Sequence, residues 1–309
     1  MYKILKNKNI LVLGGAGFLG KVIVNKLLEA EARVLVLTRF ENKIKITKTS
    51  AQPGQLEIIS ANVFEDGVLE KYIKDKYAVI NLCGILFERE ADEFSKVHAY
   101  LPALISKICK KSKIEKFVHI SALGASMNSI SLYSRSKALG EKKVLKNFKE
   151  AIVLRPSIIF GKGDNFFGQF AKMSKYLPFL PVIAPNVKFQ PVFVGDVAQA
   201  VLNSLELKTN LSRIYELGGP KTYSFYNLIT LMLKTLNRSR VLISISPRIM
   251  IFPGYIFKFL PKPPFTSDQM KLLMSDNIVN LDKPGLKDLG VKPNKLELLL
   301  PDILKFFKV

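Results

Sequence analysis

The sequence contains few residues of the kinds that bind metals or form disulfides. Its 309 residues include two cysteines, two histidines and no tryptophan. Neither Cys83 nor Cys109 belongs to a C-x-x-C pair, so we expect reduced thiols in a reducing compartment and no zinc site. His98 and His119 lack partners at the spacing of a metal site or a catalytic triad, and we interpret both as packing residues.

Long apolar runs and acidic residues are also scarce. No uncharged apolar run is as long as a membrane span, which leaves contact with a membrane surface open. The chain has 47 Lys and Arg residues against 25 Asp and Glu residues, a formal charge of +22. Three explanations compete: a nucleic acid, an anionic membrane or acidic protein partner, and a genome biased toward lysine codons. We expect no nucleic acid, because no known binding module is visible.

The first residues resemble a secretory signal, because lysines within positions 3–8 precede an apolar run. That run is followed by three regularly spaced glycines and an amphipathic helix, without a convincing cleavage site. We therefore interpret residues 10–13 as the first strand of the mature protein.

The most informative stretch is the glycine-rich turn after strand 10–13. A helical pattern of apolar residues follows it, and strand, turn and helix together are typical of a phosphate-binding turn. Gly14 would allow the tight turn, Gly17 the approach of a pyrophosphate, and Gly20 close packing of the helix on the strand. The free N–H groups of the helix N-terminus, at Phe18 and Leu19, would face the phosphates. The spacing is Gly-x-x-Gly-x-x-Gly, whereas most dinucleotide folds have Gly-x-Gly-x-x-Gly.

The ends of the second and third strands bear on the choice of dinucleotide. NAD-binding folds usually carry Asp or Glu after the second strand, which holds the ribose 2′-hydroxyl. Here strand 32–37 is followed by Thr38 and Arg39, and an arginine suits a 2′-phosphate. We therefore favour NADP(H) over NAD(H). The alternative is that Arg39 only stacks on adenine. Asn62, after strand 56–61, is expected to contact the adenine.

Strands and helices alternate along the chain. We expect strands at 77–84, 117–120, 151–155 and 213–217, and helices at 66–74, 91–111 and 197–207. This alternation predicts an α/β fold with a doubly wound parallel sheet. Asp196 is expected to cap the helix that follows it. Gly84 would lie under the cofactor, and Pro156 would close over the nicotinamide.

Tyr133 and Lys137 form the candidate catalytic pair. They are four residues apart on a predicted helix, which places them on one face, about 6 Å apart along the axis. A phenol titrates near pH 10 and is a poor acid at neutral pH, but a nearby ammonium favours its phenolate. The same lysine can hold the nicotinamide ribose, so we expect both residues to contact the cofactor. The alternative is a chance spacing of two common residues.

The glycine turn, residues 81–84 and the Tyr133-x-x-x-Lys137 pair together resemble the short-chain dehydrogenase/reductase superfamily, in its extended, epimerase-like branch. Within that branch the chain is similar to an accessory subunit of respiratory complex I, the alpha-subcomplex subunit nine family with its bacterial relatives. The stretches that carry this finer resemblance are residues 79–88, 154–161, 163–167, 190–197, 265–269 and 284–290.

The resemblance implies a Rossmann domain over residues 1–220, with some lobe-forming loops near 162–190, and a small C-terminal α/β lobe over 221–309. It also implies a tightly held NADPH and partners among the subunits of complex I, rather than a demonstrated turnover. We therefore expect a cytoplasmic protein, or one peripheral on the inner face of the cytoplasmic or mitochondrial inner membrane.

One departure from the superfamily pattern concerns the third catalytic residue. Active members carry a serine or threonine after the fifth strand, usually third in a small serine run. Here the run is Ser121-Ala122-Leu123, so the third position lacks a hydroxyl. Ser121 is a doubtful catalytic candidate because it comes early in the run, and Ser126 is the other candidate. Two functions stay open: an NADP(H)-binding accessory or assembly subunit, and a free reductase, epimerase or dehydratase for a nucleotide sugar, isoprenoid or other small carbonyl compound.

The residues beyond 220 differ in character. We expect helices at 225–236, 266–276 and 295–308 and a short strand at 241–245. The stretch 247–264 mixes large apolar residues with three basic ones, which suits an interfacial helix and equally a helix packed on the small lobe. Residues 176–187 contain three prolines and are expected to end the preceding crossover.

Overall fold

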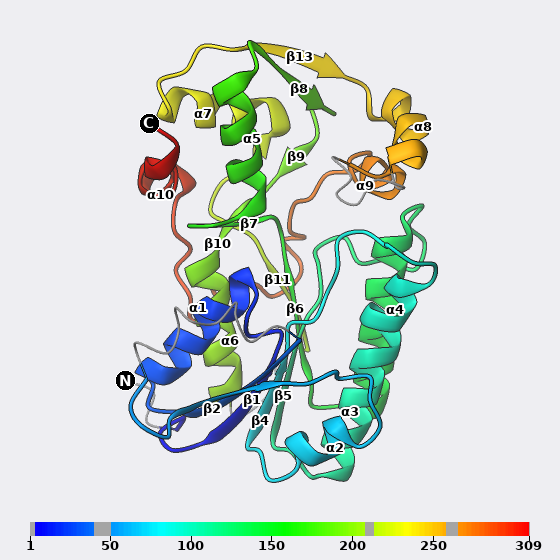
Figure 1. Cartoon of the computed structure of the whole chain (residues 1–309), viewed down its shortest axis with the longest axis vertical. Helices are drawn as coiled ribbons and strands as arrows, with labels where there is room; N and C mark the ends of the chain where they lie inside the picture. Colours follow the sequence, from blue (N-terminus) through cyan, green and yellow to red (C-terminus); the bar gives the residue numbers. More distant parts are fainter. Residues whose placement is uncertain (1–3, 40–50, 208–212, 258–264, 309) are drawn as a thin grey trace.

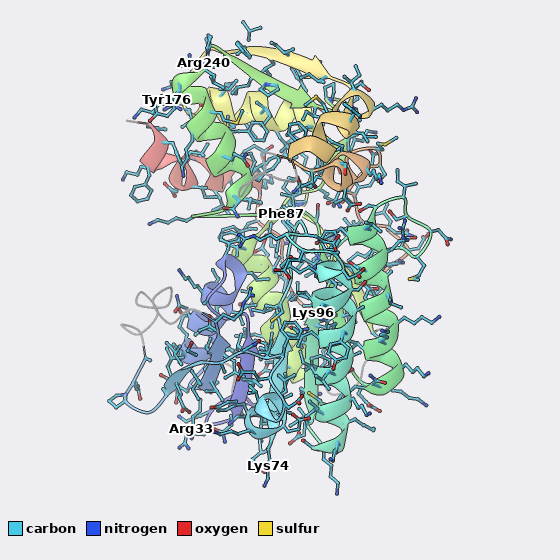
Figure 2. All side chains as sticks on the ribbon, turned by 45° about the vertical axis from the view of Figure 1, so that its right-hand side comes forward. Arg33, Lys74, Phe87, Lys96, Tyr176 and Arg240 are labelled. Atoms are coloured by element: carbon cyan, nitrogen blue, oxygen red, sulfur yellow. The ribbon has the colours of Figure 1, made fainter. Side chains whose placement is uncertain are left out.

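The computed structural model describes residues 4–39, 51–207, 213–257 and 265–308. The chain forms a lower body around a sheet and an upper lobe of helices and short strands (Figure 1). Figure 2 shows Phe87, on the loop after the fourth strand, where the two parts meet, whereas Tyr176 and Arg240 lie at the far end of the lobe. Within the described ranges, no helix is both long and apolar enough to cross a membrane.

The lower body is built on seven strands in the order β11-β6-β5-β4-β1-β2-β3. Each strand is parallel to its neighbours. The strands are β1 Asn9–Leu13, β2 Arg33–Thr38, β3 Leu56–Ser60, β4 Ala78–Asn81, β5 Lys116–Ile120, β6 Ile152–Pro156 and β11 Ile214–Leu217. The chain order reverses between β1 and β4, and open parallel sheets bind ligands at such a point, outside the carboxyl ends of the strands.

Helices cover both faces of the sheet because its central strands are apolar on both sides. Ile10 and Val12 pack against helices α1 (Phe18–Glu29) and α6 (Val194–Glu206). Leu11 and Leu13 pack in the core on the opposite face. That face is covered by α2 (Val68–Ile73), α3 (Leu101–Lys111) and α4 (Leu132–Asn147) (Figure 1). The predicted doubly wound α/β fold is confirmed.

A late segment of the chain returns from the upper lobe to the lower body. Leu286, Leu289 and Val291 are buried in the core formed by α1, α6 and the sheet. The N–H of Glu216 in β11 donates to the carbonyl of Pro284 at 2.9 Å. The boundary at residue 220 stays a prediction, but the lower body also uses residues from beyond it.

The upper lobe has its own apolar core, which includes Phe167, Leu180, Leu228 and Leu300. Its helices are α5 Asn165–Tyr176, α7 Phe225–Thr235, α8 Pro247–Phe257, α9 Ser267–Leu272 and α10 Leu296–Ile303, with a 3₁₀ turn at Lys305–Phe307. Its strands are β8 Phe179–Ile183 and β13 Val241–Ile245, which pair in parallel, and β9 Lys188–Phe189 and β12 Tyr223–Ser224, which pair antiparallel. The short pair β7 Ile159–Phe160 and β10 Val192–Phe193 joins the two parts.

Four local expectations are corrected. Helix α5 and strand β8 occupy the region expected to consist of loops, and β8 accommodates Pro181 because it pairs on one edge only. Asp196 does not cap α6, which begins earlier, at Val194; its carboxylate instead accepts from the backbone and side chain of Asn294. The fourth strand ends at Asn81 rather than residue 84. The helix expected at 91–111 begins with a π-helical turn, Ser95–Tyr100.

Candidate functional site

The glycine turn joins β1 to α1 at the switch point of the sheet. Gly14 has φ +82°, a conformation that favours glycine. A Cβ at Gly20 would lie 2.4 Å from the carbonyl oxygen of Gly14. Both glycines are therefore required by the protein itself, for the turn and for the close packing of the helix on it.

Gly17 is less crowded than Gly20. A Cβ at Gly17 would meet only the Gly14 oxygen, at 3.3 Å. Gly17 precedes the first residue of α1, and no side chain caps that helix. The leading N–H groups of α1, at Phe18 and Leu19, have no partner inside the helix. The turn thus presents backbone without side chains and uncapped donors, the arrangement that binds a phosphate.

The ends of β2 and β3 lie side by side, since Thr38 pairs with Ser60. Arg39 is exposed directly after β2, and its charge acts on the thiol of Cys83. Burial raises the pKa of that thiol to about 11, against the opposing fields of Arg39 and Lys137. Asn62 is exposed after β3, and its side-chain oxygen accepts from the N–H of Phe64 at 3.1 Å. The structure thus brings both predicted adenosine contacts to one edge.

Tyr133 and Lys137 lie on the inner face of α4. The Lys137 ammonium is 5.9 Å from the centre of the Tyr133 ring. Burial raises the pKa of Tyr133 to about 12 and lowers the pKa of Lys137 to about 8, although Glu141 opposes the latter shift. Among the described residues the ammonium has one hydrogen bond, to the carbonyl of Ile120 at 3.5 Å. Lys137 therefore has donors available to a ligand.

Gly84 lies next to this ammonium. A Cβ at Gly84 would come within 3.2 Å of the Lys137 Nζ atom. Gly84 is exposed, so the backbone after β4 and the lysine face the same space. On the other side Pro156 is buried at the end of β6, and its carbonyl accepts from the N–H of Leu123 at 2.9 Å.

The two histidines are buried beside Lys137 and hold its surroundings in place. His98 accepts from the N–H of Ile85 through Nε2, so its Nδ1 carries the proton and donates to Ser136. Its ring lies edge-on to Tyr133, with centroids 5.2 Å apart. Burial and the charge of Lys137 lower the pKa of His98 to about 2, so the ring is neutral. The prediction of a packing role omitted this contact with the tyrosine.

His119 and Ser121 present polar atoms that lack partners among the described residues. Asn81 donates to Nδ1 of His119 at 3.1 Å, which leaves the proton on Nε2. Burial, with the charge of Lys137, lowers the pKa of His119 to about 3. The His119 Nε2 atom and the Ser121 hydroxyl are both buried without a hydrogen-bond partner. They lie on the same face of the β5 end, where a bound group would be needed to satisfy them.

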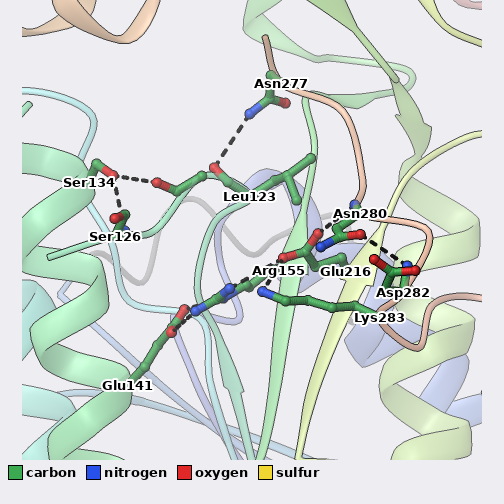
Figure 3. Close-up of polar contacts among 11 residues, drawn as sticks. Leu123, Ser126, Ser134, Glu141, Arg155, Glu216, Asn277, Asn280, Asp282 and Lys283 are labelled. Carbon is green, nitrogen blue, oxygen red and sulfur yellow. Dashed lines mark hydrogen bonds and ion pairs between the residues drawn. The ribbon is translucent and has the colours of Figure 1, made fainter. Parts of the chain in front are cut away.

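The position expected for the third catalytic hydroxyl is filled by the buried Leu123. Its backbone is fixed at both ends: the N–H donates to Pro156, and the carbonyl accepts from the side chain of Asn277 at 3.4 Å (Figure 3). Ser126 is exposed, and its hydroxyl accepts from the N–H of Asn128. Neither of these two residues places a hydroxyl in the buried part of the site.

Three ion pairs connect α4, which carries Tyr133 and Lys137, to strands β6 and β11 and to the returning segment (Figure 3). Arg155 of β6 lies between Glu141 of α4, with Nε and Oε1 2.9 Å apart, and Glu216 of β11, at 3.3 Å. Lys283 of the returning segment also pairs with Glu216, at 3.1 Å. Burial would raise the pKa of Glu216, but hydrogen bonds from Asn280, Lys283 and Arg155 lower it overall. Sequence analysis missed this network, because its members are remote in the chain.

Comparison with known proteins identifies the family. Residues 10–218 match the NAD dependent epimerase/dehydratase family. The chain belongs to this family. The mitochondrial NADH dehydrogenase (ubiquinone) 1 alpha subcomplex subunit 9 of Mus musculus is 31% identical over 298 residues, covering 95% of this chain and 79% of that one. The protein of the same name from Dictyostelium discoideum is 28% identical over 301 residues, covering 96% and 84%. The family expected from the sequence is confirmed.

Solved structures of the family share the fold. The UDP-glucose 4-epimerase of Thermotoga maritima, solved with UDP-glucose, has a TM-score of 0.74 at 19% identity, covering 97% of this chain and 98% of that one. Such a low identity shows the fold alone. Three features of this chain itself fit a nicotinamide dinucleotide: the glycine turn, the uncapped donors of α1 and the buried ammonium of Lys137.

Proposed function

We propose that this chain is an accessory or assembly subunit of an NADH:ubiquinone oxidoreductase, respiratory complex I, and that NADP(H) bound to it is mainly structural. The observation that carries the proposal is the contrast at the site: the glycine turn, Tyr133 and Lys137 are present, but the buried Leu123 occupies the position expected for a catalytic hydroxyl. The two relatives described above are named as subunits of that complex, which supports complex I as the partner of this chain.

In this proposal each part of the dinucleotide has its own contacts. Gly14, Gly17 and Gly20, with the N–H groups of α1, would hold the pyrophosphate. Arg39 would pair with the 2′-phosphate, and Asn62 would contact the adenine. The nicotinamide half would meet Gly84, Tyr133, Lys137 and Pro156. When bound, the cofactor can donate or accept a hydride.

The protein groups around the nicotinamide would bind rather than react. Because the pKa of Tyr133 is about 12, its phenol stays protonated at neutral pH and can donate a hydrogen bond. Below about pH 8 the buried Lys137 is charged, so its ammonium can hold ribose hydroxyls. A site with these properties can retain a dinucleotide without turning over a substrate.

A strain whose only copy of the chain carries Tyr133→Phe tests the proposal. This variant keeps the ring and loses only the hydroxyl, so the complex should assemble normally and retain nucleotide, measured on native gels and in extracts of the purified complex. Lys137→Met should weaken nucleotide binding without abolishing it, and should impair assembly. Tyr226→Phe, on an exposed tyrosine of α7, is the matched control. Normal assembly in a strain without the chain would contradict the proposal.

A free reductase, epimerase or dehydratase acting on a nucleotide sugar or other small carbonyl compound is the second candidate. The buried Ser121 hydroxyl, which has no partner among the described residues, favours it. In that case Tyr133→Phe should lower turnover by about 10²–10⁴-fold, as expected for the loss of a general acid. Accumulation of one carbonyl metabolite in the Tyr133→Phe strain, with normal assembly of the complex, would decide for the enzyme.

We further propose that the upper lobe docks on an anionic membrane surface through α8. Ile249 and Phe252 on this helix are 69% and 73% exposed, and the chain carries a charge of +22. The sequence suited both an interfacial and a packed helix over residues 247–264, and residues 258–264 of that stretch lie outside the described residues. Flotation with anionic vesicles should weaken with salt, which screens charges over about 10 Å at 0.1 M, and with Ile249→Ser and Phe252→Ser. Leu298→Ser, equally exposed on α10, should have no effect.

A further inference from the structure

The helix that carries Tyr133 and Lys137 is capped by a carboxylate from the upper lobe. Asp268 of α9 accepts three hydrogen bonds at the start of α4: from the Ser131 hydroxyl at 2.7 Å, from the N–H of Leu132 at 2.7 Å and from the N–H of Tyr133 at 3.0 Å. These residues are more than 130 positions apart in the chain. One of the three donors is therefore the backbone of the candidate site tyrosine itself.

The carboxylate is held in place from its own side. Helix α9 begins with a capping box, in which Thr266 and Gln269 each bond the backbone of the other, at 2.9 and 3.3 Å. Asp268 lies between Thr266 and Gln269, so the capping box of α9 fixes the backbone that carries its carboxylate. A fixed negative charge at a helix N-terminus compensates the partial positive charge of the first N–H groups and satisfies them.

The cap acts on the site through the first turns of α4. Tyr133 is the second residue of the helix, and Lys137 follows one turn later on the same face. Among the described residues, the Lys137 ammonium has one long hydrogen bond to the end of the sheet, to the carbonyl of Ile120 at 3.5 Å. Because Tyr133 and Lys137 lie in the first two turns of α4, the direction of the helix start contributes to where both groups lie, together with the packing of His98 against the Tyr133 ring.

We propose that Asp268 is a positioning residue for the nicotinamide half of a bound dinucleotide: it fixes the start of α4 so that Tyr133 and Lys137 meet the ribose. The inference rests on the proposed dinucleotide site. In this way a residue of the upper lobe would contribute to the affinity of the lower body for its ligand. Order at α9 and occupancy of the site are then coupled, and the coupling acts in both directions.

The test is a double-mutant cycle on NADPH affinity, measured from the fluorescence of bound NADPH well below the unfolding temperature. Asp268→Ala should weaken binding about tenfold, the size of a lost capping interaction, and Asp268→Asn should weaken it less, because the amide keeps one acceptor. In a Lys137→Met background, where the glycine turn still binds, Asp268→Ala should change the affinity less than twofold. Asp276→Asn is the matched control, since Asp276 also accepts a backbone N–H in the lobe, from Lys188.

The outcomes distinguish a failure of the positioning role of Asp268 from a failure of the proposed dinucleotide site. Equal effects of Asp268→Ala in both backgrounds, or no effect in either, would overturn the positioning role and leave the dinucleotide site intact. A wild-type chain that binds neither NADPH nor NADH would overturn the proposed function and the positioning role together. If Asp268→Ala does not fold, Asp268→Asn carries the same cycle.

Discussion

The two ends of the candidate site are built differently. The glycine turn consists of backbone from residues 14–20. The other end, called here the tyrosine end, consists of Tyr133 and Lys137 with contacts from residues 120–123, Asp268 and Asn277. The turn is open and carries uncapped donors. The tyrosine end is buried, and each of its groups is oriented by a neighbour from another element. The two ends therefore differ in what a substitution can do: at the turn it acts on a ligand, and at the other end it also acts on the protein.

The buried network behind the tyrosine end should give the largest effect on stability. Arg155→Met leaves Glu141 and Glu216 buried without their shared partner, and breaking such a pair typically destabilises by about 3–5 kcal/mol. Urea unfolding monitored by circular dichroism measures the loss. Lys221→Met removes the exposed partner of Glu297 and should change stability by less than about 1 kcal/mol. Equal losses in both variants would show that burial does not strengthen the network.

Lys137 should make the stability of the ligand-free protein depend on pH. Its pKa is about 8 in the folded chain and near 10.5 when unfolded, so between these values unfolding takes up a proton and stability rises with pH. The rise should reach up to about 3 kcal/mol and be absent in Lys137→Met. Unfolding free energies of both proteins from pH 7 to 10 give the difference; parallel curves would exclude the lowered pKa.

Substitutions in the turn should separate binding from folding. Gly17→Val places a side chain on the face of the turn that would hold the phosphates, so it should lower NADPH affinity at least about 100-fold, ~2.7 kcal/mol, with a smaller loss of melting temperature than Gly20→Val. Gly20→Val, whose Cβ would overlap the Gly14 oxygen, should instead destabilise the fold. Retained NADPH fluorescence in Gly17→Val would remove the turn as the phosphate site.

The smallest effect is expected at Arg39, after β2, on the selectivity between NADPH and NADH. Loss of the charge-assisted contact in Arg39→Asp should cost about 1.5–3 kcal/mol of NADPH binding and much less of NADH binding. Calorimetry with both dinucleotides measures the difference. Equal weakening of the two would show that Arg39 does not recognise the 2′-phosphate and would leave NAD(H) as the cofactor.

The same contrast explains which features could be predicted from the sequence. The strands and the glycine turn follow from contiguous patterns, because buried parallel strands are continuous apolar runs and a turn needs glycine at fixed spacing. Asp268 and Arg155 could not be placed in this way, since their partners lie in other elements. Strand β8 was missed because the prolines of residues 176–187 indicate loops, whereas an edge strand tolerates them.

The returning segment has a consequence for biosynthesis. Leu286, Leu289 and Val291 complete a core whose other members, such as Ile10, leave the ribosome almost 300 residues earlier. Until these late residues emerge, the face between α1 and α6 stays incompletely covered, and contacts of such long sequence separation form slowly. The nascent lower body therefore exposes apolar surface while most of the upper lobe is synthesised. Because such surface makes a nascent chain prone to aggregate, we expect this chain to need chaperones until residues 286–291 have emerged.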